Sequence, residues 1–396
     1  MICHPGLDDA PHRCAGSAFS GVRAPSCNAA TIVYALCKSQ MTERKVDSML
    51  AQDAALTGDK AIESAEELSS IAFGFMASKA LFAGLHVDLF SLLADGPRSA
   101  EELAKAAGIP LNRIVTLTTA LASVGLLTIA DDKKIRNSPA AQSFLSKQSK
   151  YDFGDYLRFQ IDQQMYPFLL QLDAVMKGTL SDDAIASYRH WMADEEQASV
   201  YSESQHAGSL GPGRTLARKV DLSKASTLLD VGGGTGAMTI SLCKEYDNLH
   251  ATIIDFPNVA EIGWRFISEA NLVDRLRYIP GNAVEVQWPG NQDAILMSYL
   301  MSGVPGDDVA GLLRKAFEAL SPGGKLMVHD FMVEDDRRGP ALAALWQLQH
   351  MAFTPDARSL SVGWLTEAGK KIGFKVDDVD NLIPAMTKLI VFSKPA

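Results

Sequence analysis

The chain has 396 residues, of which 47% are hydrophobic and 21% charged, a composition typical of globular proteins with room for two domains. The formal net charge of −10 argues against a general binder of nucleic acid or of an anionic membrane surface. No apolar run reaches the length that we expect of a membrane span. We therefore predict neither nucleic acid nor membrane as a partner.

Residues 1–45 form a leader that differs in composition from the rest of the chain. Four of the five cysteines lie in its first forty residues, and Cys243 is the exception. A body with one cysteine indicates a reducing, intracellular setting. The Cys and His spacing of the leader fits no familiar zinc framework, so we expect no metal site. We expect the leader to be disordered. It is either an upstream extension of a cytoplasmic protein or a segment that targets a chloroplast or mitochondrion.

Residues 66–150 are predicted to form a helical domain with a small β-wing. Residues 68–93 are apolar on too many faces for a surface helix, which is typical of a helix buried against another subunit. Ser99 and Glu102 form a capping box at the start of the next helix. A second helix at about 111–124 and a hairpin at about 126–134 complete the order of a winged-helix fold.

The second helix of this domain argues against DNA binding. It offers only Asn112 and Arg113 as polar readers, and its other residues are Ile, Val, Leu, Thr and Ala. Reading DNA requires basic and amide side chains at base edges and phosphates. We therefore do not assign DNA recognition to the winged helix.

Residues 151–215 are predicted to link this domain to the next. Aromatic side chains alternate here with Gln and Arg, which suits a pocket for a small polar substrate. Arg158 is able to pair with a carboxylate through its two parallel N–H groups, although a surface ion pair is an equally good interpretation. The predicted substrate-binding residues of this segment are Arg158, Gln163, Tyr166, Tyr201 and His206.

The segment TLLDVGGGTG at 227–236 organises the rest of the chain. It predicts a buried strand, a tight glycine turn and a helix over 237–245, an arrangement that holds nucleotide-like ligands. Asp230 at the strand end would repel a pyrophosphate but suits an ammonium group. Asp255 ends the next apolar run, where ribose hydroxyls would lie. An amino-acid ammonium and a ribose together indicate S-adenosylmethionine.

These motifs, with IIDFP at 253–257, resemble class I methyltransferases. The order of winged helix, helical linker and methyltransferase domain resembles the two-domain small-molecule O-methyltransferases over residues 66–394. The resemblance implies an α/β fold with a Rossmann-like methyltransferase domain at 216–396 and a homodimer formed by the all-helical winged-helix domain. It also implies a substrate pocket walled by the linker. The predicted cofactor-binding residues are Asp230, Gly232, Gly234, Gly236, Asp255, Phe256, Gly281, Asn282, Ser298 and Tyr299.

The chain departs from that family at the catalytic base. O-methyltransferases of this kind carry a histidine after the fourth strand, where this chain has Ser302. A neutral serine is no general base without an activating neighbour. We therefore assign no certain catalytic residue. Either His206, His329 or His350 supplies the base, with His206 as our first choice, or the reaction needs none. Ser302 and His350 complete the predicted substrate-binding residues.

Methylation of a thioether needs no base, because its sulfur carries no proton. The runs at 73–82, 205–212 and 298–305 resemble the DsyB-type S-methyltransferases. Those enzymes methylate 4-methylthio-2-hydroxybutyrate during dimethylsulfoniopropionate synthesis. The resemblance implies that substrate, with its carboxylate bound by Arg158. Two alternatives stay open: O-methylation of a phenolic or hydroxy-acid metabolite, and a regulatory protein that binds S-adenosylmethionine without catalysis.

Overall fold

The amino-terminal domain consists of short amphipathic helices and one β-hairpin. The computed structural model describes residues 61–180 and 188–396, so the predictions for the leader at 1–45 lie outside the described residues. The elements are α3 (Ala65–Ala72), α4 (Gly74–His86), α5 (Leu89–Leu92), α6 (Ala100–Ala107), α7 (Leu111–Ser123), β1 (Leu127–Ile129), β2 (Ile135–Asn137) and α8 (Pro139–Phe144).

The predicted helix starts and the wing of this domain are confirmed. The Ser99 hydroxyl accepts from the Glu102 amide at 3.2 Å, and the Glu102 carboxylate accepts from the Ser99 amide at 2.7 Å. Strands β1 and β2 pair antiparallel, with Thr128 opposite Arg136. Leu89, Leu103 and other apolar side chains are fully buried between the helices.

The apolar stretch before this core is largely exposed in the single chain. Leu68, Ile71, Phe73, Phe75 and Met76 are each at least half exposed. By length and composition alone, the stretch Ala65–His86 is apolar enough to cross a membrane, which differs from our expectation of no such run. A helix that packs against protein can have the same length and composition, so these two features alone are weak evidence of a membrane span.

The linker consists of helices that lead into the second domain. They are η1 (Tyr156–Met165), α9 (Tyr166–Leu169), α10 (Leu172–Lys177), α11 (Tyr188–Ala193) and α12 (Glu195–Lys219). Element η1 is a π-helix, a rare conformation that is frequent at functional sites. Helix α12 continues past the predicted linker boundary at 215.

The carboxy-terminal domain alternates strands and helices. Its elements are β3 (Thr227–Val231), α13 (Ala237–Glu245), β4 (His250–Asp255), α14 (Pro257–Glu269), β5 (Leu276–Pro280), β6 (Gln292–Ser298), α15 (Asp308–Ala319), β7 (Leu320–Asp330), α16 (Ala341–Phe353), α17 (Val362–Ile372), β8 (Lys375–Ile383) and β9 (Thr387–Ser393). The predicted helix at 237–245 has the predicted bounds.

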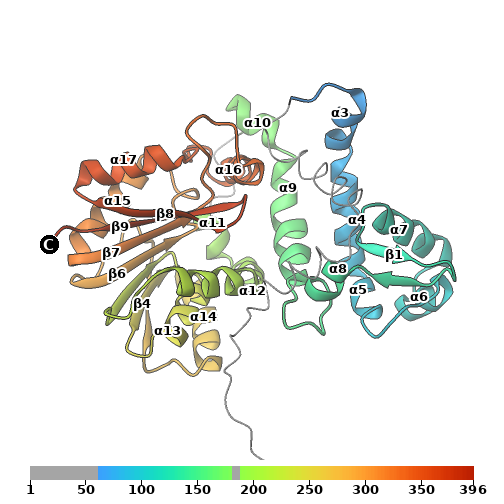
Figure 1. Ribbon diagram of the computed structural model, residues 1–396, viewed down its shortest axis with the longest axis horizontal. Helices are drawn as coiled ribbons and strands as arrows, with labels where there is room; N and C mark the ends of the chain where they lie inside the picture. The colour runs from blue at the N-terminus through green and yellow to red at the C-terminus, as the bar shows by residue number, and fades with distance from the viewer. Residues whose placement is uncertain (1–60, 181–187) are drawn as a thin grey trace, which may run out of the picture. The chain divides into compact units, whose positions relative to one another are not determined.

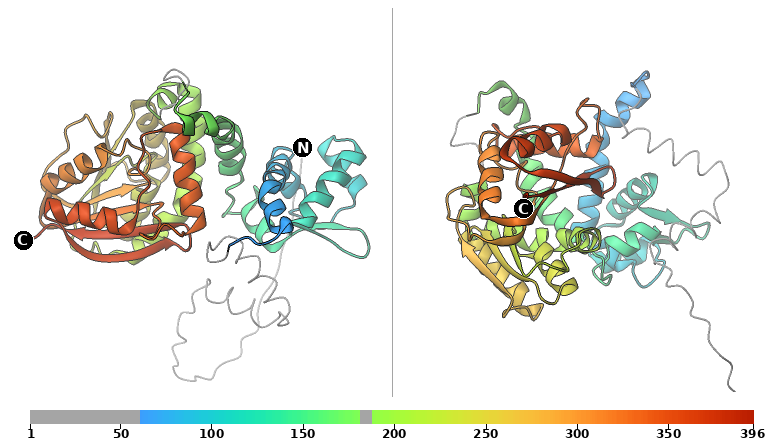
Figure 2. Two further views of the ribbon diagram at one scale, coloured as in Figure 1. Left: turned by 90° about the horizontal axis from the view of Figure 1, so that it is seen from above. Right: turned by 60° about the vertical axis from the view of Figure 1, so that its left-hand side comes forward.

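These strands form one sheet in the order β5-β4-β3-β6-β7-β9-β8. The five strands from β5 to β7 are parallel, and β9 and β8 are antiparallel additions at one edge. Helices α13 and α14 cover one face, and α15 and α17 cover the other (Figures 1 and 2). This is the predicted Rossmann-like α/β fold. It places the ends of β3, β4 and β6 side by side, where open α/β sheets bind ligands.

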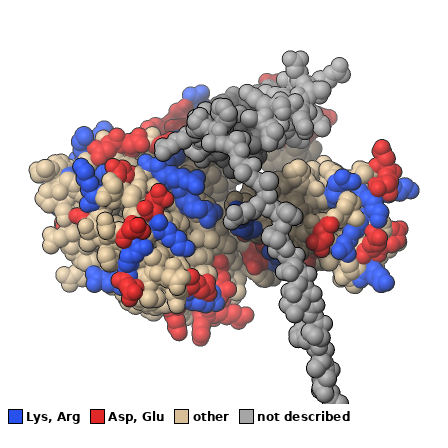
Figure 3. Space-filling view, turned by 60° about the horizontal axis from the view of Figure 1, so that its bottom comes forward, with Lys and Arg blue, Asp and Glu red and all other residues tan. Residues whose placement is uncertain are grey.

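Charges of both signs are spread over the surface. On the face drawn in Figure 3, lysine and arginine side chains alternate with aspartate and glutamate over the described part of the chain. A nucleic-acid binder concentrates its basic residues on one face. The visible face shows no such concentration.

Helix α12 crosses α13 at Gly213, and this contact is testable. A Cβ on Gly213 would lie 2.7 Å from the Ser241 Oγ and 3.2 Å from the Ala237 carbonyl oxygen. We expect Gly213→Ala to lower the free energy of unfolding by about 1–3 kcal/mol because the two helices must separate. Gly211→Ala is the matched control, since a Cβ there meets nothing within 4 Å. Because Gly211 precedes Pro212 in the helix, this control should change the free energy of unfolding by less than about 1 kcal/mol. Urea unfolding measures both, and equal effects would contradict the packing.

Candidate active site

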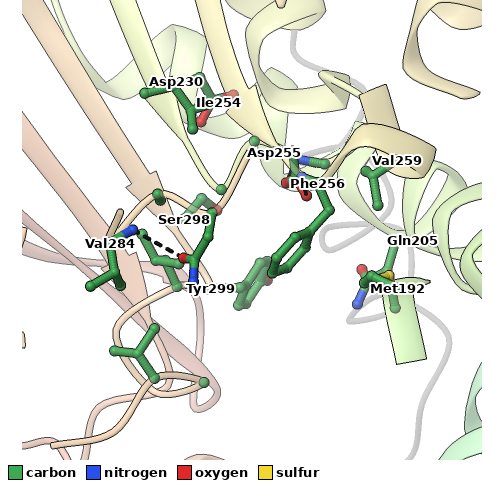
Figure 4. Close-up of a pocket in the computed structure, with 18 of the residues that line it drawn as sticks. Met192, Gln205, Asp230, Ile254, Asp255, Phe256, Val259, Val284, Ser298 and Tyr299 are labelled. Atoms are coloured by element: carbon green, nitrogen blue, oxygen red, sulfur yellow. Dashed lines mark hydrogen bonds between the residues drawn. The ribbon is translucent and has the colours of Figure 1, made fainter. Parts of the chain in front are cut away.

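A cavity of about 670 Å³ opens at the carboxyl ends of β3, β4 and β6. Its volume lies within the range of small-molecule and cofactor sites. Figure 4 shows Phe256 pointing into it, with Ser298 and Tyr299 on one side and Met192 and Gln205 on the other. The cavity therefore lies between the sheet and the linker helices.

Backbone amides of the glycine turn after β3 donate hydrogen bonds to the end of β4. Gly232 and Gly234 have φ of 68° and 58°, the left-handed region that favours glycine. The Gly232 amide donates to the Ile254 carbonyl at 2.8 Å, and the Gly234 amide donates to the Asp255 carboxylate at 2.7 Å. Both residues line the cavity, whereas Gly236 does not and begins α13.

Asp230 is a buried carboxylate with one unpartnered oxygen. Its Oδ2 accepts from the Thr239 hydroxyl at 2.6 Å, while Oδ1 has no hydrogen-bond partner in the described chain. Burial, together with the charge of neighbouring Asp255, raises the pKa of Asp230 to about 7, although the hydrogen bond from Thr239 favours the ionised form. Because unpaired buried carboxylates are costly, Oδ1 is set to receive a donor from a ligand.

Asp255 lies at the end of the next strand. Its two oxygens accept from the Gly234 and Phe256 amides at 2.7 and 2.8 Å. Burial raises the pKa of Asp255 to about 6, although both hydrogen bonds favour the ionised form. Each oxygen retains a lone pair with which it can accept a ligand hydroxyl.

Gly281 and Asn282 line the cavity beyond Asp255. The Asn282 Oδ1 accepts from the Val284 amide at 3.0 Å, and its Nδ2 donates to Glu285 at 3.1 Å. Asn282 is therefore held within its own turn. Its oxygen retains one lone pair for an amine.

Ser298 and Tyr299 form the wall at the end of β6. The Ser298 hydroxyl is 2.8 Å from the His329 Nδ1, and the Tyr299 ring packs against Phe331 at 5.0 Å. Tyr299 has a positive φ of 57°, which is uncommon for a residue with a bulky side chain. Burial raises the pKa of its hydroxyl, so it stays protonated.

None of the three candidate histidines lines the cavity. His206 is 2.8 Å from the Thr235 hydroxyl through Nδ1 and stacks on Phe266. His329 is held between Ser298 and Thr387. His350 packs against Phe331, and its Nδ1 has no hydrogen-bond partner among the described residues.

The same histidines are poor proton acceptors. Burial lowers the pKa of His206 to about 4, with help from the charges of Arg265 and Lys244. Burial alone lowers the pKa of His329 to about 3 and that of His350 to about 4. The geometry therefore gives no support to our prediction of His206 as a base or substrate contact, or to His350 as a substrate contact.

Ser302 is also withdrawn from the cavity. It is buried, its hydroxyl donates to Asp330 at 2.5 Å and its amide donates to the same carboxylate at 3.0 Å. Burial raises the pKa of Asp330 to about 6, against the lowering by these hydrogen bonds. Ser302 therefore connects the segment after β6 to the end of β7 and does not line the cavity, contrary to the prediction that it binds substrate.

The remaining predictions for substrate-binding residues of the linker have different outcomes. Tyr201 lines the cavity, as predicted, and its ring packs against Trp191 at 5.1 Å. Arg158 does not, because its guanidinium pairs with Asp88 and Asp155. Arg158, which was predicted to bind a substrate carboxylate, thus connects the linker to the junction of α4 and α5.

Gln163 and Tyr166 lie outside the cavity lining as well. Gln163 is exposed, and the Tyr166 ring packs edge-on against Phe82 and under the Lys79 ammonium. A π-helix has a different residue spacing from an α-helix, so the side chains of 156–165 face other directions than an α-helical reading predicts.

Sequence reasoning missed several residues that line the cavity. Helix α12 contributes Ser202, Gln205 and Ser209, at positions i, i+3 and i+7 of one helix face. Asp308 and Asp356 lie at the rim. The helical spacing was visible in the sequence, but the rim carboxylates come from segments that only the fold brings together.

The comparisons with known proteins identify this architecture. Residues 181–364 match the model of the O-methyltransferase domain, and residues 69–147 match that of the O-methyltransferase dimerisation domain. The N,N-dimethyltransferase OxyT of Streptomyces rimosus is 30% identical over 84% of this chain and 98% of its own length. The chain belongs to the O-methyltransferase family. It binds S-adenosylmethionine, and the dimerisation domain indicates a homodimer.

Another relative is named for an oxygen acceptor, whereas OxyT is named for a nitrogen. The tetracenomycin 8-O-methyltransferase TcmO of Streptomyces glaucescens is 28% identical over 76% of this chain and 90% of its own length. Human N-acetylserotonin methyltransferase in complex with S-adenosylmethionine has a TM-score of 0.75 at 19% identity, covering 85% of this chain and 99% of that one. Membership of the family therefore identifies the cofactor but does not identify the acceptor atom.

Asp230 gives a pH-dependent test of the cofactor site. We expect an ionised Asp230 to attract the cofactor's ammonium group, and its pKa of about 7 means that it gains a proton as the pH falls through neutrality. We expect the wild-type Kd for S-adenosylmethionine to be about fourfold higher at pH 6.5 than at pH 8.5, the ratio of the ionised fractions. Asp230→Asn should bind more weakly at both values, without that dependence. Isothermal titration calorimetry measures this, and a variant that keeps the wild-type pH dependence would contradict the assignment.

Proposed function

We propose that this chain methylates a small metabolite on a thioether sulfur, without a histidine base. The observation that carries the proposal is the cavity lining. Among the described residues it holds carboxylate side chains, namely Asp230, Asp255, Glu285, Asp308 and Asp356, and no Lys, Arg or His. Of the three candidate histidines, His329 and His350 are buried outside the cavity, and His206 is half-buried against Phe266.

The residues of the cavity fit S-adenosylmethionine. The unpartnered Asp230 Oδ1 suits its ammonium group, and the Asp255 oxygens suit its ribose hydroxyls. The cavity lies at the strand ends where this fold places such ligands. When bound, the cofactor supplies a methyl group on a positively charged sulfur.

The lining suits an acceptor that becomes a cation. A methylated thioether is a sulfonium, so its formation leaves the net positive charge of the occupied cavity unchanged. Aromatic residues of the lining, among them Tyr201, Phe256 and Tyr299, suit such a charge, and the carboxylates add a favourable field. The protein's part is then to align the two sulfurs and exclude water, with no proton to remove.

O-methylation of a phenol is the second candidate, and the relatives favour it. TcmO is named as an 8-O-methyltransferase, and the matched domain model is that of O-methyltransferases. A phenol must lose its proton to a base. Within the described lining, only carboxylates such as Asp308 and Asp356 and the tyrosine hydroxyls are available for that.

Product analysis distinguishes the candidates. The protein is incubated with S-adenosylmethionine and either 4-methylthio-2-hydroxybutyrate or a simple phenol, and the products are fragmented in a mass spectrometer. We expect a methylsulfonium from the thioether and no methyl ether from the phenol. Asp230→Asn is the control and should lose either activity through weaker cofactor binding.

The contrary outcomes have distinct meanings. A phenyl methyl ether without any sulfonium would replace the proposal by the second candidate. Tight binding of S-adenosylmethionine without product from either acceptor would favour the regulatory alternative.

A further inference from the structure

Two residues that line the cavity each carry a buried polar atom that has no hydrogen-bond partner among the described residues. One such atom is the Asp230 Oδ1, and the other is the Ser202 Oγ of α12. Ser202 is 2% exposed, so its hydroxyl cannot be satisfied by bulk water. Buried hydroxyls are normally paired, and an unpaired one beside a cavity points to a ligand group.

Ser202 also forgoes the bond that helical hydroxyls usually make. A serine or threonine in a helix commonly donates to the carbonyl one turn earlier. Thr215 of the same helix donates to the Gly211 carbonyl at 3.2 Å, and Ser241 of α13 donates to the Ala237 carbonyl at 3.0 Å. The Ser202 hydroxyl makes no such bond and is free to serve a ligand.

The course of α12 places Ser202 away from the cofactor loop. Gly213 packs on α13, His206 contacts Thr235 of the glycine turn, and Tyr201 packs against Trp191 of the linker. Ser202 lies one helical turn before His206, about 6 Å along the axis. Ser202 therefore lies on the linker side of the residue that contacts the glycine turn.

We propose that the Ser202 hydroxyl binds an oxygen-bearing group of the acceptor, either a hydroxyl or a carboxylate, at a distance from the atom that is methylated. This inference rests on the proposed function and specifies how its site holds the acceptor. The described lining has no cationic side chain, so a neutral hydroxyl holds the acceptor where an ion pair was predicted from Arg158.

Calorimetry on the intact protein tests the proposal. Protein saturated with S-adenosylhomocysteine is titrated with 4-methylthio-2-hydroxybutyrate, and in parallel with 4-methylthiobutyrate, which lacks the hydroxyl. We expect Ser202→Ala to raise the acceptor Kd about tenfold, the cost of one hydrogen bond to a buried partner. The Kd for S-adenosylmethionine should stay within twofold, and Ser202→Thr, which keeps a hydroxyl, should restore acceptor binding.

The two acceptors identify the bound group. If Ser202→Ala weakens binding of the hydroxy acid alone, Ser202 binds the acceptor's hydroxyl. If it weakens binding of both acceptors equally, Ser202 binds the carboxylate. Either result supports the proposal. Ser204→Ala is the matched control, because Ser204 lies on the same helix, is buried to 3% exposure and does not line the cavity. It should leave both acceptor Kd values unchanged.

Three results would overturn the proposal. If the wild-type protein binds the acceptor and Ser202→Ala leaves the acceptor Kd unchanged, this inference alone is refuted. An equal rise in the Kd of acceptor and S-adenosylmethionine refutes it too, since it indicates a distorted helix. Wild-type protein that binds neither thioether refutes it together with the proposed function.

Discussion

The buried carboxylate of Asp230 is the group on which the rest of the site depends. Burying an acid without a full set of donors costs several kcal/mol, and the protein raises its pKa to about 7 in response. Thr239 satisfies one oxygen, and the other has no hydrogen-bond partner among the described residues. A cationic ligand recovers that cost on binding. The glycine turn and Asp255 surround the group with a geometry that only the parallel sheet provides.

The same principle explains where the histidines are. His329 and His350 are buried and His206 is half-buried, so the neutral form of each is favoured, and none of the three lines the cavity. His329 connects Ser298 of β6 to Thr387 of β9, and His206 connects α12 to the glycine turn. The described lining therefore offers no imidazole to deprotonate a hydroxyl, and an acceptor without a proton needs none.

Local sequence patterns predicted most of the fold and the cofactor-binding side of the cavity. The capping box at Ser99 and Glu102 and the strand–glycine–helix unit at 227–245 each depend on neighbours in sequence, and the structure confirms them. The acceptor side could not be predicted in this way. Arg158 turned toward Asp88 and Asp155 because those acids come close only in three dimensions, and its segment is a π-helix that no periodicity indicated. Ser202 was overlooked because nothing in a sequence distinguishes a satisfied hydroxyl from an unsatisfied one.

The pH dependence of kcat, measured at saturating S-adenosylmethionine and acceptor, tests the claim of base-free transfer most directly. Saturation removes the contribution of Asp230 to cofactor binding, so kcat reports only groups that titrate in the loaded enzyme. The account predicts a kcat that is constant from pH 6 to pH 9, because no proton leaves the acceptor. A kcat that rises tenfold per pH unit to a plateau would show a required base and contradict the account.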